Sequence, residues 1–167
     1  MAKNLYLAGV GGWLRFLIIL LMIIGPLIWF GNLSNDFYDT ERQFPQLLDD
    51  AQWSNYKLVS RLIFVISVAI SFSAGYRLWK IHFSESVRFA ILALWLSGPL
   101  GNLMYFVAAV FIFGLQAGAK GLPDMLSGIL GSSIGAGIWT AYLMRSLRVK
   151  NTYRTSLSAQ NRGTTSA

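Results

Sequence analysis

Four long apolar runs separated by charged residues dominate this chain. They extend from Leu14 to Phe30, from Leu62 to Tyr76, from Phe89 to Ala119 and from Met125 to Met144. A helix that crosses a bilayer needs about 20 mainly apolar residues, and bases near its ends can reach out to the headgroups. The pattern predicts an all-α protein, an integral membrane four-helix bundle, with spans at about 12–30, 58–78, 88–115 and 124–145.

The third run is uncharged for 31 residues and contains Gly98-Pro99. A break at this point would leave about nine residues on one side, too few to cross a hydrocarbon core of roughly 30 Å. Proline removes a backbone donor and its ring collides with the preceding turn of a helix. We therefore expect one long helix that is kinked near Pro99.

The spans predict a single domain over residues 1–154, with an external loop at 31–56 and a disordered cytoplasmic tail at 155–167. The loop is acidic but also aromatic. It either rests at headgroup depth, with a short helix after Pro45, or forms a lid or partner-docking surface. The tail has few apolar residues to bury. Three further spans, and no small-residue cleavage site after Phe30, favour a retained first span over a signal peptide.

Composition supports a membrane protein and narrows the chemistry. Hydrophobic residues make up 54% of the chain and charged residues 13%, with a mean hydropathy of +0.51. Soluble domains carry about 25% charged residues. Cysteine is absent, which excludes disulfides and thiol nucleophiles. His82 is the single histidine, so we expect no metal site and no cofactor.

The net charge of +7 raises the question of nucleic acid binding, but its distribution argues against it. Alternating loops place ten bases and one acid on one side of the membrane, and four bases and six acids on the other. Cytoplasmic loops favour Lys and Arg. The sequence therefore predicts both termini in the cytoplasm, and no nucleic acid partner.

The fourth span carries small residues at four-residue spacing. Gly131 and Gly135 form a GxxxG pattern, and Gly128 and Ser132 form a neighbouring row. Small residues let two helix backbones approach closely. The partner of this face is either another span of the same chain or a second copy of the protein.

A polar notch is expected on the third span, where Trp95, Asn102 and Tyr105 share a face around the proline. Asn102 either fills the kink with an interhelical hydrogen bond or marks a binding site. The apolar runs contain no ionisable residue away from their ends, which argues against ion-coupled transport and intramembrane catalysis. The loop acids, which include Asp36 and Asp39, are the only enzymatic candidates. We expect solvated acids and no enzyme.

The end of the fourth span combines bases, hydroxyls and aromatic rings. If the helix continues beyond Arg145, then Arg145, Arg148 and Thr152 share one face. Bases here suit anionic lipid at the cytoplasmic face. Charge alone does not explain the other residue types, so the segment is either a simple topology anchor or a specific lipid- or partner-docking patch. The candidate contact residues are Arg145, Ser146, Arg148, Lys150, Thr152 and Tyr153.

Two motifs carry a resemblance. The first consists of Gly11, Gly12, Trp13 and Leu14, and the second of Trp139, Tyr142, Ser146, Arg148, Val149, Lys150, Thr152 and Tyr153. Together they resemble a family of small bacterial inner-membrane proteins classed only as a domain of unknown function. Leu147 stands where a second base is expected, and Tyr153 where Phe is usual.

The resemblance implies a multi-pass protein of the bacterial inner membrane and no particular activity. From the residues, we predict a non-enzymatic module that associates with lipid or with membrane proteins, either a separate partner or further copies of itself. The alternative is a small transport or ligand-binding membrane protein that uses the notch around Asn102.

Overall fold

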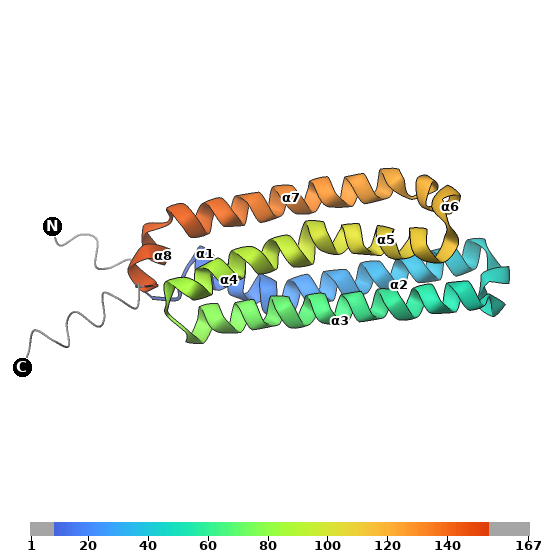
Figure 1. The fold of residues 1–167 in the computed structure, drawn as a ribbon. Helices are drawn as coiled ribbons and strands as arrows, with labels where there is room; N and C mark the ends of the chain where they lie inside the picture. Colours follow the sequence, from blue (N-terminus) through green and yellow to red (C-terminus); the bar gives the residue numbers. More distant parts are fainter. Residues whose placement is uncertain (1–8, 154–167) are drawn as a thin grey trace, which may run out of the picture.

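The computed structural model describes residues 9–153, which form a bundle of four long helical rods (Figure 1). The first rod is built from α1, η2 and α2, the second from α3, the third from α4, η4 and α5, and the fourth from α7. The elements are α1 (Trp13–Ile19), η2 (Leu20–Ile24), α2 (Gly25–Gln43), η3 (Pro45–Asp49), α3 (Ala51–Lys80), α4 (Ser84–Trp95), η4 (Leu96–Leu100), α5 (Gly101–Phe113), α6 (Leu115–Lys120), α7 (Leu122–Arg145) and α8 (Leu147–Thr152).

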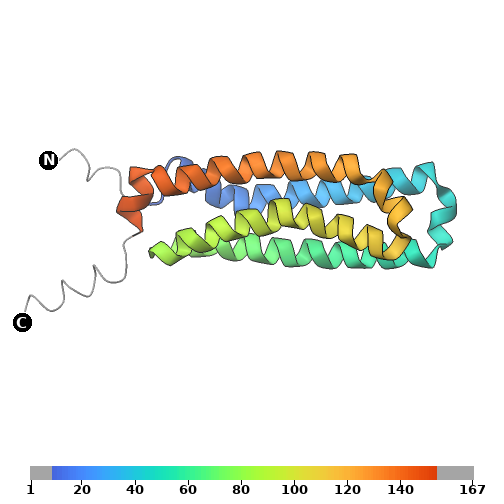
Figure 2. The same ribbon diagram turned by 45° about the horizontal axis from the view of Figure 1, so that its top comes forward.

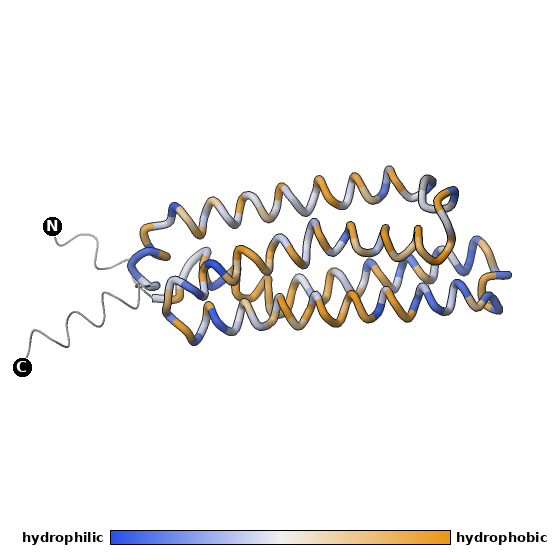
Figure 3. The backbone as a smooth tube through the Cα atoms, viewed as in Figure 1, coloured by the Kyte–Doolittle hydropathy of each residue, from blue (hydrophilic) through white to orange (hydrophobic). Residues whose placement is uncertain are grey.

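All four rods are long and apolar enough to cross a bilayer, which confirms the predicted four-span architecture. They cover Trp13–Gln43, Ala51–Lys80, Ser84–Phe113 and Leu122–Arg145. Large apolar side chains such as Leu62, Ile134 and Ile138 are exposed on their outer faces. Hydrophobic residues follow the length of the rods, with hydrophilic residues concentrated towards the ends (Figure 3). The chain is therefore a multi-pass membrane protein.

The loop predicted at 31–56 is the main correction. α2 runs on to Gln43 and α3 begins at Ala51, so only seven residues connect the two helices. Phe44 ends α2 because the residue before a proline is pushed out of helical geometry. Asp50 then caps α3 by accepting a hydrogen bond from the Gln52 amide at 2.6 Å. The short helix expected after Pro45 is present as the 3-10 turn η3.

Two prolines are accommodated by π-helical turns. η4 contains Pro99, and η2 ends one residue before Gly25-Pro26. A widened turn relieves the collision between a proline ring and the carbonyl in the preceding turn. The third rod is continuous from Ser84 to Phe113 and bends at η4 (Figure 2). The prediction of one long helix disturbed near Pro99 is confirmed.

The bundle is packed unevenly along its length. We call the end that carries α8, Gly9–Gly12 and residues 81–83 the basic end, and the end that carries η3 and α6 the acidic end (Figure 1). The apolar core lies towards the basic end, and its buried members are Leu14, Leu17, Ile18, Leu21, Ala74, Leu78, Ala90, Ala93, Leu143, Val149 and Tyr153. None of these comes from residues 22–73, so the acidic half is packed more loosely. The predicted tail, 155–167, lies outside the described residues.

Candidate functional site

The two sequence motifs, at opposite ends of the chain, meet at the basic end. The Gly9 amide donates to Thr152 Oγ1 at 2.9 Å, and Thr152 Oγ1 donates to the Arg148 carbonyl at 2.7 Å. Arg148 covers Gly11 so closely that a Cβ at Gly11 would lie 2.5 Å from Nη1. Gly12 adopts a positive φ of 57°, which disfavours other residues. The Arg148 guanidinium of the second motif therefore lies over Gly11 of the first, while Gly12 is favoured by its backbone conformation.

Tyr153 anchors the chain after α8. Its side chain is 5% exposed, its hydroxyl donates to the Leu78 carbonyl, and its ring stacks on His82 with centroids 5.9 Å apart. Burial raises the pKa of the Tyr153 hydroxyl above its ordinary value. Tyr153 therefore holds the C-terminal end of α3 close to α8, which follows α7 in the chain.

Aromatic rings close the bundle between α1 and α7 at the same end. Trp139 lies with its ring centroid 6.4 Å from that of Trp13 and 5.9 Å from that of Phe16. Tyr142 meets Trp139 edge to face at 5.8 Å. We call these contacts, together with those of Gly9, Gly11, Arg148, Thr152 and Tyr153, the clasp.

The clasp changes the interpretation of the predicted docking patch. The fourth helix ends at Arg145, as predicted, because Ser146 is extended, so the condition under which Arg145, Arg148 and Thr152 would share one face is not met. Val149 is 3% exposed and packs in the core with Tyr153. Arg145 and Lys150 remain exposed, while Ser146 is half-buried. Thr152, Val149 and Tyr153 therefore pack within the chain, and the exposed bases of this segment are Arg145 and Lys150.

The small-residue face of α7 divides into two rows. A Cβ at Gly128 would lie 2.8 Å from Asn102 Oδ1, and Ser132 lies against Gly98 of η4. Gly131 and Gly135 have no such neighbour within 4 Å among the described residues. The Gly128 row therefore packs within the chain, and the GxxxG row faces outward.

Replacing Gly128 by alanine should lower stability by roughly 1–2 kcal/mol, because the new methyl group overpacks the contact with Asn102. Gly131→Ala is the matched control, and it should be neutral or stabilising by up to about 1 kcal/mol through helix propensity. Unfolding titrations of both variants in the same detergent measure the difference. Equal destabilisation by both would mean that the Gly131 row is also buried in a contact, one made outside this chain.

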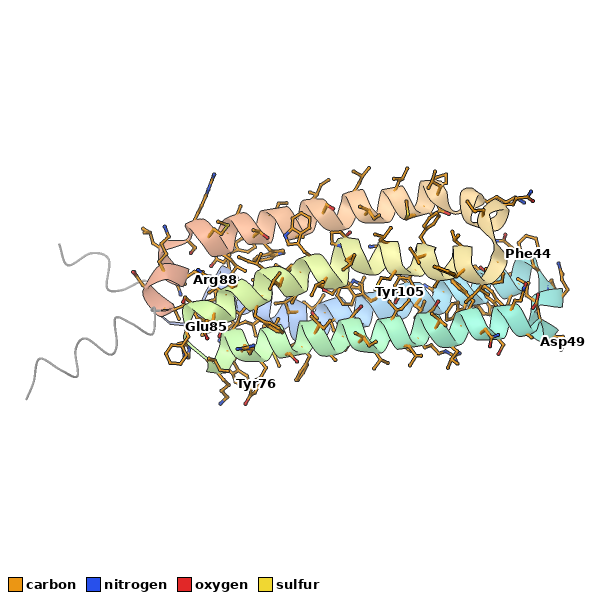
Figure 4. The ribbon with its side chains drawn as sticks, viewed as in Figure 1. Phe44, Asp49, Tyr76, Glu85, Arg88 and Tyr105 are labelled. Atoms are coloured by element: carbon orange, nitrogen blue, oxygen red, sulfur yellow. The ribbon has the colours of Figure 1, made fainter. Side chains whose placement is uncertain are left out.

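Two residues of the predicted polar notch form hydrogen bonds between the third rod and α7. Asn102 Nδ2 donates to the Gly98 carbonyl at 3.0 Å and lies 3.4 Å from both the Gly128 carbonyl and Ser132 Oγ. Trp95 Nε1 donates to Thr140 Oγ1 at 3.3 Å. Both residues tie the third rod to α7, the simpler of the two predicted roles. Tyr105 instead points into the middle of the bundle (Figure 4).

A cleft of about 850 Å³ opens in the loosely packed acidic half, and it includes Asn102 and Tyr105. α2 packs on α3, and α7 packs on α4, η4 and α5, so the cleft separates α2 from α7. Its floor is formed by α3 and α5. The aromatic residues in its wall are Trp29, Phe37, Phe44, Trp53, Tyr56, Phe64, Tyr105, Phe106 and Phe113.

Polar groups line this cleft in two places, near the middle of the rods and towards the acidic end. Ser67, Ser97 and Asn102 line it near the middle of the rods, where α3 and α5 meet η4. Asp36, Lys120 and Asp124 line it towards the acidic end. The cleft therefore has an aromatic body, a hydroxyl- and amide-bearing inner part and a charged rim.

Neighbouring contacts hold the rim in place. Glu41 on α2 accepts hydrogen bonds from Lys57 Nζ at 2.6 Å and from Trp53 Nε1 at 2.9 Å, both on α3. Trp53 and Tyr56 stack with centroids 5.6 Å apart, and Phe113 of α5 lies 5.4 Å from Tyr56. These contacts join α2, α3 and α5, so that their cleft-lining side chains are held on a common scaffold.

The α2 wall of the cleft was missed by sequence reasoning. Trp29, Asn32, Asp36 and Thr40 recur at three- or four-residue spacing, which places them on one face of a helix. The expected loop was based on falling hydropathy after Phe30. The helical periodicity and the absence of proline between Pro26 and Pro45 were the signals that could have revealed this wall.

Residues 7–154 match the family described as "Protein of unknown function (DUF2569)". The match includes both motifs of the clasp, and it confirms the resemblance to a family of unknown function. No curated protein and no solved structure matches the chain.

Proposed function

We infer that this chain, which belongs to the DUF2569 family, is a non-enzymatic membrane protein that holds a lipid-like amphiphile in the cleft between α2 and α7. The observation that carries the proposal is the cleft itself, with its aromatic wall and charged rim. An amphiphile matches this arrangement, because its apolar part can contact the aromatic rings while its headgroup contacts the charged rim. The proposal joins the lipid-associating and ligand-binding functions predicted from the sequence.

The size of the cleft favours a small ligand over a protein helix. A volume of about 850 Å³ is within the range of small-molecule sites, roughly 300–1,000 Å³. A transmembrane helix about 10 Å across and 30 Å long would fill roughly 2,400 Å³. A partner helix would therefore require the rods to separate, whereas a single lipid-like molecule would not.

The charges of the rim indicate the class of headgroup. Asp36 and Asp124 place two carboxylates at the cleft, and Lys120 places one ammonium there. A zwitterionic phospholipid with an amine meets both signs, because its amine pairs with a carboxylate and its phosphate with Lys120. We therefore propose an aminophospholipid as the ligand.

Asp36→Asn should weaken binding of an aminophospholipid by roughly fivefold to tenfold, since it removes one charge-assisted contact while keeping the size of the side chain. Asp39→Asn is the matched control, because Asp39 is exposed on the same helix and does not line the cleft. Phosphatidylethanolamine with a photoreactive acyl chain is crosslinked to the full chain, and the labelled peptides are mapped. We expect labels on Phe106 and Met125 in the wild type and in Asp39→Asn. Labelling of both residues should be weaker in Asp36→Asn.

Equal labelling in all three proteins would contradict the headgroup assignment, and labels confined to outward residues such as Ile134 would contradict the site. Asn102 lines the same cleft, so the notch predicted around it and the lipid site proposed here share one space. The alternative function, transport, would use the same cleft and would show as net transfer of the lipid between leaflets.

The charge distribution supports an orientation with the basic end in the cytoplasm of a bacterial cell and the acidic end outside its inner membrane. Reporter fusions test this proposal. A cytoplasm-dependent reporter should be active after Tyr153, and a periplasm-dependent reporter should be active when inserted between Leu47 and Asp50. The reverse pattern would refute the orientation.

A further inference from the structure

A second, smaller groove lies at the basic end, whereas the cleft described above lies in the acidic half. It has a volume of about 280 Å³ and is bordered by the first turns of α4, the last turn of α7, and α8. Ser84, Val87, Arg88 and Ile91 line it from one face of α4, at the spacing of successive helical turns. Leu143 and Val149, which are almost fully buried, belong to its apolar lining.

Two bases border this apolar groove. Arg88 comes from α4 and Lys150 from α8, and both side chains are exposed. Neither forms an ion pair with a carboxylate in the described part of the chain, where Lys57–Glu41 is the ion pair. Figure 4 shows Arg88 and Glu85 at this end of the bundle, at the opposite end from Phe44 and Asp49.

The chain itself supplies little negative charge to balance these bases. Within residues 9–153, the segments at the basic end carry seven Lys and Arg residues and a single acidic side chain, Glu85. An apolar groove with a basic rim between transmembrane helices is the arrangement that binds anionic lipid headgroups. A diffuse basic surface would attract anionic lipid without fixing its position. The groove provides a defined position at which one lipid could bind.

We propose that this groove binds one anionic phospholipid, with its phosphate between Arg88 and Lys150 and an acyl chain along Ile91, Leu143 and Met144. The clasp borders the site, because Tyr153 lines the groove beside Val149 and also anchors the chain after α8. The inference is independent of the aminophospholipid in the cleft, since the two sites share no lining residue. The protein would thus bind a zwitterionic headgroup towards its acidic end and an anionic headgroup at its basic end.

Native mass spectrometry of the full chain in a neutral detergent tests the proposal. Phosphatidylglycerol is titrated against phosphatidylcholine, and bound lipid is counted. We expect one tightly bound phosphatidylglycerol, and a roughly tenfold or greater loss of its affinity in Arg88→Gln/Lys150→Gln. Arg15→Gln/Lys80→Gln is the matched control, because it removes the same charge from exposed positions outside the groove.

A second pair of variants tests the apolar part without removing a base. Met144→Glu adds a carboxylate to the groove and should also weaken phosphatidylglycerol binding, whereas Leu147→Glu, equally exposed but outside the groove, should not. Equal losses in either variant and its control would show general surface attraction and overturn the site. Equal affinity for phosphatidylcholine, or displacement of the lipid by inorganic phosphate alone, would also overturn it. Asp36→Asn should leave phosphatidylglycerol binding unchanged. A failure of the groove proposal can therefore be distinguished from a failure of the cleft proposal.

Discussion

Replacing Tyr153 by alanine is expected to release α8 and the N-terminal motif from the end of the bundle, and to lower stability by about 3 kcal/mol. The substitution removes a buried ring, its stacking on His82 and its hydrogen bond to the Leu78 carbonyl. It also opens the core around Val149. Unfolding titrations measure the loss, and hydrogen exchange of the amides of α8 shows whether the clasp has opened.

Tyr153→Phe separates the hydroxyl from the ring and should cost about 1 kcal/mol. Burial raises the pKa of the Tyr153 hydroxyl, so the unfolded chain deprotonates at a lower pH than the folded one. The contribution of the hydroxyl is therefore complete below about pH 10 and is lost as pH rises further. The stability difference between wild type and Tyr153→Phe should shrink above that pH.

Leu147→Ala is the control for both Tyr153 variants, because Leu147 is exposed on α8, the short helix that Tyr153 follows. It should have little effect on the stability of the bundle. Unchanged protection of α8 in Tyr153→Ala would contradict the role of Tyr153 as the anchor. A pH-independent difference between wild type and Tyr153→Phe would show that the hydroxyl is not effectively buried.

Filling the cleft should abolish ligand binding without unfolding the protein. Ala109 lines the cleft from the α5 side, and a tryptophan there would occupy space between the aromatic walls. We expect Ala109→Trp to reduce crosslinking of photoreactive phosphatidylethanolamine at Met125 by at least about tenfold. The fold should survive because the substituted position faces a space that is already open.

Val107→Trp is the matched control on the same helix, since Val107 is exposed and does not line the cleft. Its labelling should equal that of the wild type. Full labelling in Ala109→Trp would exclude the cleft as the lipid site. If Ala109→Trp instead caused the loss of a co-purifying membrane protein, with lipid labelling unchanged, the cleft would be a helix-docking surface.

The four spans and the disturbed third helix were predictable from the sequence because they depend on local properties. Bilayer thickness sets the length of an apolar run, and the missing donor of Pro99 disturbs a helix wherever it lies. The extension of α2 was not predicted, since hydropathy falls after Phe30 although nothing stops the helix before Phe44. α3 has 30 residues, or about 45 Å, so these helices continue well beyond a hydrocarbon core of roughly 30 Å.

The motif Trp139–Tyr153 shows where sequence reasoning reached its limit. The excess of bases at this end and the need for a further explanation of Thr152 and Tyr153 could both be read from the sequence. Their partners could not, because Gly9 and Thr152 are 143 residues apart and meet only in the folded chain. The structure consequently adds contacts within the chain, the clasp, to the predicted anchor or docking patch, and it places one base of this motif, Lys150, beside a groove.

By itself, the sequence determined that this protein is a four-span membrane bundle with charge separated between its ends. Both properties follow from the composition of contiguous segments. Only the tertiary structure decided which small residues are packed, which motifs contact each other and where the bundle stays open. Gly128 and Gly131 are three residues apart and chemically identical, yet one meets Asn102 and the other faces outward. That difference arises because packing depends on the neighbouring helix, which no single segment of the chain encodes.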